Sequence, residues 1–346
     1  MAGVVRLWFG DHPSNFLADG RFLQRQDHVL DSVANYYGAK NPKIPYKHGR
    51  LFLDNGAFAA TKHGLRLNPE RVKDLQEAFD PDYTIPLDYP FLPTMRVKTM
   101  ERRWKLTQDN TVDLIETAEL REVIPALHAW SRASLMQNLR WVVKHADSDY
   151  VAVGSILSDD SIASDTYFGD RMPSRALVDM LVETVNLVRE QSDFSIHMMG
   201  FGSSPLMLHL GFYCGINSTD TTGYRVGAAH GNIVLPGTGW RAISKRKKKF
   251  GNTRLSADER QKLSECRCPV CRNQQQLLVD DWKARATHNR YVLMREETTA
   301  RRLTDGNSES YERYVNRLFH ASRAPWIVNL WEYTKAKVHS YQIHFR

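Results

Sequence analysis

Three of the four cysteines lie within six residues of one another, at Cys266, Cys268 and Cys271, and His288 follows 17 residues after the last of them. Three thiolates and an imidazole can enclose a tetrahedral metal ion, and a site closed by four protein ligands is structural. The pattern therefore predicts one structural zinc ion. The alternatives are three reduced surface thiols and, for the fourth ligand, an unligated surface histidine.

Three aspartates each follow an apolar run that is typical of a buried strand: Asp54, Asp88 and Asp220. Cleavage of an N-glycosidic bond needs a carboxylate that attacks or stabilises the sugar carbon. It also needs an acid or base that handles the departing and incoming bases. A single aspartate at a strand end is more commonly a cap or turn residue. Three such aspartates at the same end of one fold would favour a catalytic site.

The positive charge of the chain is concentrated in one segment. Residues 241–295 hold fifteen Lys or Arg and five Asp or Glu, a net of +10, whereas the whole chain carries +8 and the rest therefore −2. The segment includes the run Lys245, Arg246, Lys247, Lys248 and Lys249. Such a block is typical of a surface that binds a polyanion, and the alternative is a merely solvated face.

The composition is that of an ordinary globular protein, with 42% hydrophobic and 25% charged residues in a chain of 346. This length suits one large barrel or two domains. No apolar run is long enough for a membrane span, and the first residues turn polar too soon for a signal peptide. We therefore expect no membrane partner and a cytoplasmic location, in the host cell if a phage encodes the chain.

The elements that must position these residues alternate along the chain, with short apolar runs followed by polar or glycine corners and amphipathic stretches. We predict strands over 4–9, 51–53, 83–87, 123–127, 150–153, 194–198 and from 216, and helices over 26–37, 69–79, 100–120, 132–144, 175–190 and 206–212. Six or seven such units favour a (β/α)₈ barrel over an open sheet.

In a barrel of this kind, chemistry sits at the carboxyl ends of the strands. The residues that we place there are Asp54, Asp88, His128, Gly154, Gly200 and Asp220. We divide the chain into a barrel core over 1–240, a basic zinc-binding subdomain over 241–295, and C-terminal helices over 296–346 that complete the barrel.

Six segments resemble, in order, the motifs of the tRNA-guanine transglycosylase family, and the zinc cysteines follow them in the family's order. The segments are Leu53–Phe58, Leu87–Pro90, Leu127–Trp130, Val151–Ser155, Met198–Gly202 and Ser218–Asp220. The resemblance covers roughly residues 50 to 295. It implies a zinc-carrying (β/α)₈ barrel that exchanges a guanine in nucleic acid for a deazapurine.

The resemblance also implies roles for individual residues. Asp220 would attack the anomeric carbon of the sugar and expel guanine, and Asp54 would be the general acid and base. The base would be contacted by Asp88, His128, Gly154, Ser155 and Gly200. Arg225 and the lysine-rich run over 245–249 would contact the nucleic acid. Zinc would be held by Cys266, Cys268, Cys271 and His288.

Departures from the family pattern bear on the substrate. His128 stands where the family has a base-reading glutamine; a histidine can donate one hydrogen bond, but the recognition pattern must differ. Asn55 and Ala57 replace Ser and Gly, and residues 221–225 replace the Pro-Thr-Arg segment that approaches the tRNA loop. The first motif and the Gly154–Ser155 pair are more similar to the DNA-acting branch, which inserts 7-cyano-7-deazaguanine or a related 7-deazaguanine into DNA.

The favoured hypothesis is therefore a DNA-guanine transglycosylase whose second substrate is a 7-deazaguanine base. A tRNA-guanine transglycosylase is the second hypothesis, and a catalytically silent, zinc-stabilised nucleic-acid-binding protein is the third. The presence of both Asp54 and Asp220 argues against the third. The sequence leaves open the target sequence, the oligomeric state and any partner protein.

Overall fold

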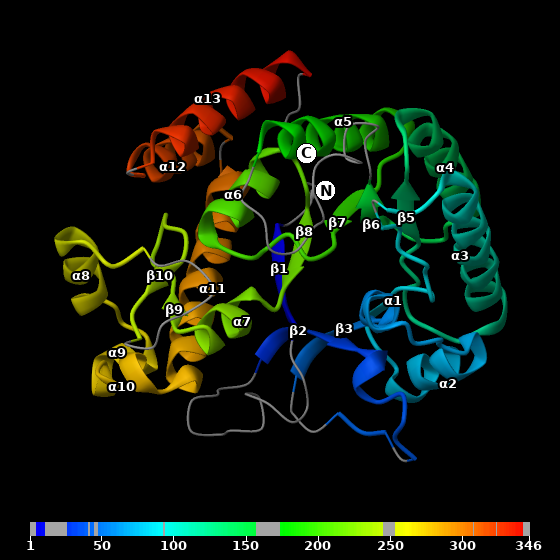
Figure 1. Cartoon of the computed structure of the whole chain (residues 1–346). Helices are drawn as coiled ribbons and strands as arrows, with labels where there is room; N and C mark the ends of the chain where they lie inside the picture. Colours follow the sequence, from blue (N-terminus) through cyan, green and yellow to red (C-terminus); the bar gives the residue numbers. More distant parts are fainter. Residues whose placement is uncertain are drawn as a thin grey trace.

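Eight parallel strands form one curled sheet in the computed structural model, which describes residues 5–10, 26–40, 42–44, 48–92, 94–156, 174–244, 253–306, 308–322 and 324–341 (Figure 1). The strands are β1 (Arg6–Gly10), β2 (Gln26–Ser32), β3 (His48–Asp54), β4 (Tyr83–Thr84), β5 (Ala126–Ala129), β6 (Tyr150–Ile156), β7 (Ser195–Met198) and β8 (Ser218–Thr221). Apart from β4 and β5, neighbours along the chain pair with one another, and β1 also pairs with β8. A parallel bridge between Thr84 and Val123 joins β4 to the segment just before β5 and closes the ring.

Helices follow most strands and cover the outside of the sheet. They are α1 (Ala57–His63), α2 (Pro69–Phe79), α3 (Val97–Thr117), α4 (Arg132–His145), α5 (Arg175–Gln191), α6 (Pro205–Tyr213) and α7 (Gly223–Ala229). Asn68, Ser131 and Ser174 cap α2, α4 and α5 through side-chain oxygens. The (β/α)₈ prediction is confirmed.

Strand residues alternate between two cores. Leu7, Phe9, Leu127 and Val153 are among the buried residues of the large cluster that includes the surrounding helices. Residues of opposite parity form a separate cluster, composed of Trp8, Leu30, Phe52, Ile85, Ile124, Ala126 and Ala152. This second cluster fills the barrel below the carboxyl ends of the strands, so the side chains at those ends rest on an apolar floor.

Two predicted elements are wrong. Residues 26–37 form strand β2 and the short 3₁₀ turn η2 (Val33–Asn35), not a helix. Asp31, near the end of β2, is buried, and it accepts hydrogen bonds from Ser32 N and Tyr36 Oη. The strand expected over 83–87 is two residues long, since Pro86 has no N–H to continue the ladder.

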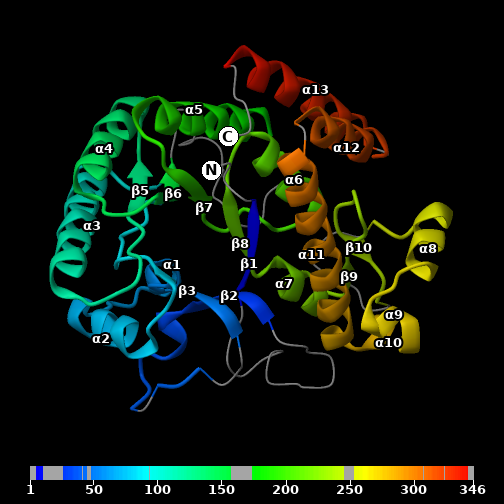
Figure 2. The ribbon, with the colours of Figure 1, turned by 180° about the vertical axis from the view of Figure 1, so that it is seen from behind.

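A cysteine-rich insertion follows α7. It contains β9 (Asn232–Ile233), β10 (Arg241–Ala242), α8 (Ala257–Ser264), α9 (Pro269–Gln274) and α10 (Leu277–Asp280), and it leads into α11 (Trp282–Gly306). Figures 1 and 2 both place this insertion on the side of the barrel away from α2, α3 and α4. The predicted division at 240/241 falls inside the β9–β10 hairpin, and the division at 295/296 falls inside α11.

The last three helices pack on the barrel and on one another. Helix α11 lies against α6, α7 and β1, while α12 (Ser308–His320) contacts α6 and α13 (Pro325–Ser340) contacts α5 (Figure 2). None of the described helices is long and apolar enough to cross a membrane.

Candidate active site and metal centre

One cavity of about 1010 Å³ opens at the carboxyl ends of the strands. Its lining includes the six residues that the sequence placed there, Asp54, Asp88, His128, Gly154, Gly200 and Asp220, and also Ser155. They come from β3, the segment after β4, β5, β6, the segment after β7, and β8. The fold therefore brings together the predicted catalytic and base-contacting residues.

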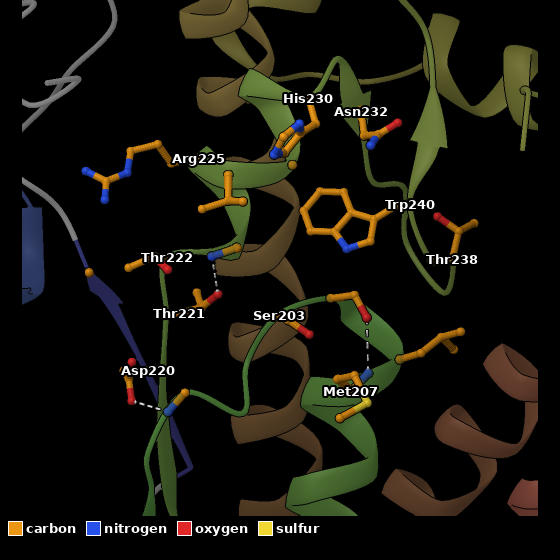
Figure 3. Close-up of a pocket in the computed structure, with 18 of the residues that line it drawn as sticks. Ser203, Met207, Asp220, Thr221, Thr222, Arg225, His230, Asn232, Thr238 and Trp240 are labelled. Carbon is orange, nitrogen blue, oxygen red and sulfur yellow. Dashed lines mark hydrogen bonds between the residues drawn. The ribbon is translucent and has the colours of Figure 1, made fainter. Parts of the chain in front are cut away.

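Asp220 is held by one of its carboxylate oxygens. Gly200 N donates to Oδ1 at 2.6 Å (Figure 3). The fully buried imidazole of His197 places Nε2 3.5 Å from the same oxygen. Oδ2 accepts no hydrogen bond from any residue that the structure describes. The carboxylate is thus oriented through Oδ1, and Oδ2 is left to react.

Asp54 is held differently, and its chemistry differs as a result. Its Oδ2 accepts from Ser32 Oγ and from Gly56 N, both at 3.0 Å. Burial and the nearby charge of Asp88 raise the pKa of Asp54 to about 7, and Asp220 adds to the shift, although the two hydrogen bonds oppose it. A carboxyl with a pKa near neutrality can both give and take a proton at physiological pH.

Asp88 and His128 form a buried pair at 2.7 Å, between Asp88 Oδ2 and His128 Nε2. The backbone N–H of Ser155 donates to His128 Nδ1 at 2.9 Å, so Nδ1 is the unprotonated nitrogen and Nε2–H donates to Asp88. Both ring nitrogens of His128 therefore take part in hydrogen bonds within the protein, and so does the Ser155 N–H. The imidazole orients Asp88 through this chain of hydrogen bonds.

The backbone around the pair leaves the imidazole little freedom. A Cβ at position 154 would lie 2.4 Å from His128 Cε1, so only glycine lets the ring pack this closely. Phe91 lies on another side of the ring, with centroids 5.3 Å apart. Thr107 Oγ1 accepts from Tyr89 N, which anchors the segment that carries Asp88.

Of the three aromatic residues beside the motifs that could sandwich a base, Phe58 alone lines the cavity among the residues described, and its exposed fraction is 46%. Tyr89 and Trp130 pack against buried clusters instead.

Cys266, Cys268, Cys271 and His288 form a group that could hold a metal ion, because one ligand atom from each lies within 4.8 Å of the others. His288 Nδ1 lies 3.3 to 3.6 Å from the three sulfur atoms. A tetrahedral zinc with ordinary bond lengths would separate nitrogen and sulfur by about 3.5 Å. His288 Nε2 donates to Val234 O at 2.9 Å, which leaves Nδ1 unprotonated for a metal.

The residues predicted to contact nucleic acid are only partly covered by the structure. Arg225 on α7 lines the cavity. Lys245, Arg246, Lys247, Lys248 and Lys249 lie outside the described residues. Several other cations of the basic segment act within the fold: Arg241 pairs with Glu259 at 2.8 Å, and Arg254 and Arg285 donate to backbone carbonyls.

Sequence reasoning missed two residues of the site, Ser32 and His197. Ser32 was placed in a helix, which hid its position at the end of β2 beside Asp54. His197 lies within a strand that was correctly predicted, and the available signal was a histidine between the apolar residues Ile196 and Met198.

A family model described as queuine tRNA-ribosyltransferase matches residues 51–321, which is more than half of the chain. The match begins in β3 and ends after α12, so it includes the three aspartates and the Cys₃His group. The chain matches no curated protein.

Proposed function

Because the chain belongs to the queuine tRNA-ribosyltransferase family, which is the tRNA-guanine transglycosylase family, we propose that it exchanges a guanine in nucleic acid for a 7-deazaguanine base. The observation that carries this proposal is the pair of unlike carboxyls in one cavity. Asp220 presents a free Oδ2, and Asp54 has a pKa of about 7. One group suits nucleophilic attack and the other suits proton transfer.

In the first half of the reaction, Asp220 Oδ2 attacks C1′ of the target nucleotide as the bond from C1′ to guanine N9 breaks. Guanine leaves with the electron pair of that bond and takes a proton from neutral Asp54. The sugar is then held as an ester of Asp220, which splits one difficult displacement into two easier ones. The Gly200 N–H on Oδ1 keeps the carboxylate in place for this attack.

In the second half, the incoming 7-deazaguanine gives its N9 proton to ionised Asp54 and N9 attacks C1′. The ester bond to Oδ2 breaks, Asp220 regains its charge, and Asp54 is neutral again for the next cycle. Proton and charge therefore balance with no added reactant, and one carboxyl serves as acid and then as base.

Asp88 is the acceptor for the N–H groups of the guanine-type edge. His128 donates to one of its oxygens and so fixes the rotamer in which the other faces a base. The histidine does not read the base itself in this arrangement, because both its nitrogens are already bonded. This assigns His128 a positioning role, where the sequence had suggested a direct contact.

Zinc is the metal that the Cys₃His group suits, and its contribution is to the fold. Four protein ligands leave no open position for substrate. Cys266, Cys268, Cys271 and His288 would tie the insertion to α11 and, through Val234, to the segment after β9.

We favour DNA over tRNA, and the support comes from the motifs: Asn55 and Ala57 in the first one, and residues 221–225 in place of Pro-Thr-Arg. The family description, which names a tRNA substrate, supports the alternative. Incubation of the protein with labelled guanine and either DNA or unmodified tRNA separates the two. Incorporation into DNA alone supports our preference, incorporation into tRNA alone supports the alternative, and incorporation into neither contradicts the proposed exchange.

A further inference from the structure

Asp31 is a buried carboxylate that no step of the exchange uses. It comes directly before Ser32, the last residue of β2, and it is fully buried. Successive residues of a strand point to opposite faces of the sheet. Ser32 therefore lines the cavity, whereas Asp31 faces the apolar cluster around α2 to which Tyr36 belongs. Burial of a carboxylate is costly unless donors surround it, so the partners of Asp31 indicate its role.

Three donors from the turn that follows β2 bind Asp31. Ser32 N and Asn35 Nδ2 donate to Oδ1, both at 2.7 Å. Tyr36 Oη donates to Oδ2 at 2.6 Å. These bonds hold the 3₁₀ turn η2 in one place relative to the end of the strand. Asp31 is thus the internal anchor of the turn.

The anchored turn fixes both donors that Asp54 receives. Ala34 N donates to Ser32 Oγ at 3.4 Å, and the Ser32 hydroxyl donates in turn to Asp54 Oδ2 at 3.0 Å. Gly56 N is the second donor to that oxygen, and it belongs to a turn that packs directly on η2. A Cβ at position 56 would lie 2.7 Å from Ala34 Cβ. A movement of η2 would therefore displace both donors.

Both donors bind the same oxygen of Asp54. Its Oδ1 accepts no hydrogen bond from any residue in the part of the chain that the structure describes. The carboxyl is therefore held through Oδ2, and Oδ1 is left to exchange a proton with the base. Proton transfer needs this oxygen within hydrogen-bond reach of the base, so a rotated carboxyl would react more slowly.

We propose that Asp31 is a positioning residue for Asp54 and acts through Ser32 and the turn η2. It keeps two donors on Asp54 Oδ2 and so keeps Oδ1 aimed at the bound base. This inference rests on the proposed function, because it takes Asp54 to be the acid and base of the exchange. It adds that a carboxylate outside the cavity controls how Asp54 holds and gives up its proton.

The bond from Ser32 has an effect on protonation with a definite sign. The titratable side chains that the other strands bring toward Asp54 are Asp88, His128, His197 and Asp220. Burial raises the pKa of Asp54 to about 7, and the charges of Asp88 and Asp220 contribute, while the bond from Ser32 opposes the shift. Loss of that bond should therefore raise the pKa further, whereas loss of the charge of Asp88 should lower it.

An NMR titration with ¹³C-labelled aspartate measures this effect without the reaction. The carboxyl signal that is absent from Asp54→Asn is assigned to Asp54, and its midpoint should lie near pH 7 in the wild type. In Ser32→Ala the midpoint should rise by about one pH unit, as expected for a lost hydrogen bond to a charged group. In Asp31→Ala it should move in the same direction, because Ser32 is no longer held.

Asp31→Asn and Ser192→Ala are the controls, and both should titrate as the wild type does. Asparagine keeps an oxygen that can accept from Ser32 N and Asn35 Nδ2. Ser192 Oγ accepts a backbone N–H at 3.4 Å, as Ser32 Oγ does, but lies outside the cavity. If Asp31→Ala is unfolded, Tyr36→Phe replaces it and should give a smaller shift of the same sign. A wild-type midpoint in Ser32→Ala, or in the folded variant of Asp31 or Tyr36, overturns the proposal.

Adduct formation in a single turnover is the second readout, and it separates this proposal from the proposed function. On the acid side of the inflection, Asp31→Ala should form the adduct about 10-fold more slowly than the wild type, because Oδ1 of Asp54 is no longer aimed at the base. Ser192→Ala should keep the wild-type rate. If the wild type forms no adduct while the titration midpoints move as expected, the proposed function fails and the positioning of Asp54 stands. Equal rates of adduct formation in Asp31→Ala and the wild type would show that Asp31 only supports the fold.

Discussion

At the scale of single residues, the proposed chemistry depends on two aspartates that the fold places in unlike surroundings. Asp220 receives the Gly200 N–H on one oxygen, which leaves the other to react. Asp54 is enclosed near two other carboxylates, and burial with the charges of Asp88 and Asp220 raises its pKa to about 7. A raised pKa suits Asp54 for proton transfer, and an oxygen without a hydrogen bond suits Asp220 for attack.

The raised pKa of Asp54 predicts a pH dependence with a definite sign. Below about pH 7 Asp54 is neutral and can protonate the leaving guanine, and above it the carboxyl is ionised and cannot. Adduct formation in a single turnover should therefore fall as pH rises through about 7. Attack by the incoming base on the preformed adduct should rise over the same range.

Asp88→Asn is the matched variant for this test. It removes the charge that contributes most, after burial, to the shift, so the inflection should move to lower pH even if the rate also falls. An inflection at the same pH in Asp88→Asn, or a pH-independent rate in the wild type, would contradict the assignment of Asp54.

His128 gives a second test at this scale. Its substitution by alanine frees Asp88 and leaves the Ser155 N–H without its partner, so KM for the incoming base should rise roughly 10-fold or more. His128→Gln retains a donor that can reach Asp88 and should be affected less. Steady-state kinetics with varied base concentration separate KM from kcat. Equal kinetics for both variants and the wild type would show that His128 does not position Asp88.

The aspartates could be found from the sequence because each follows an apolar strand, and period-two alternation then turns it toward the barrel interior. The roles of the residues that contact these aspartates could not be found from the sequence. Whether His128 contacts a base or Asp88 depends on the Ser155 N–H, and nothing in a linear sequence places that donor beside Nδ1. His197 was missed for the same reason, since its importance lies in a neighbour on the next strand.

At the scale of secondary-structure elements, α11 links the cysteine-rich insertion to the barrel. His288, one member of the metal-binding group, lies on this helix. Arg285, one turn earlier, donates to the carbonyl of Ala228 on α7. The same helix packs against β1 and α6. Loss of the metal should therefore loosen one wall of the active-site cavity as well as the insertion.

Metal removal tests this link. Metal analysis should find one zinc per chain, and Cys268→Ser or chelation should lower the Tm by roughly 5 °C and weaken substrate binding. Cys214→Ala is the control, because Cys214 is buried in the large core away from the metal-binding group. A protein that keeps its full Tm and solubility after all metal is removed would contradict a structural zinc.

Helices whose first residue follows a capping side chain could be predicted well, and elements without such a residue could not. The capped helices α2, α4 and α5 begin at the expected residues because Asn68, Ser131 and Ser174 satisfy N–H groups locally. Strand β2 was taken for a helix because Val29, Leu30 and Val33 have helical spacing. Val29 and Leu30 pair with β1 and β3, a tertiary arrangement that periodicity cannot reveal. The predicted division at 240/241 follows the change in composition and coincides with the start of β10, within a hairpin that begins at Asn232.

At the scale of the whole molecule, net charge overstates the surface available for nucleic acid. Arg241, Arg254 and Arg285 belong to the basic segment, yet they pair with Glu259 or with backbone carbonyls. The sequence has five further cations in the run over 245–249, and Lys262 of the same segment lines the cavity.

Neutralising Lys245, Lys247, Lys248 and Lys249 should weaken binding and lower the slope of log affinity against log salt. On duplex DNA the slope should fall by as much as about 0.9 for each phosphate that the protein no longer neutralises. Exchange on a very short strand should suffer less, because it cannot reach that surface. The control neutralises four exposed cations of α3 and α4: Lys98, Arg102, Arg140 and Lys144. An unchanged slope in the first variant would show that the run is a solvated surface.

The central claim is that Asp220 carries the sugar while one base replaces another. The most direct measurement is a denaturing gel of the protein incubated with nucleic acid under conditions that trap the adduct. Wild-type protein should give a covalent band, and Asp220→Ala should give neither the band nor labelled guanine incorporation. Asp54→Asn should bind nucleic acid nearly as tightly as the wild type but turn over far more slowly. A wild-type band or wild-type exchange in Asp220→Ala would contradict the assignment of the nucleophile.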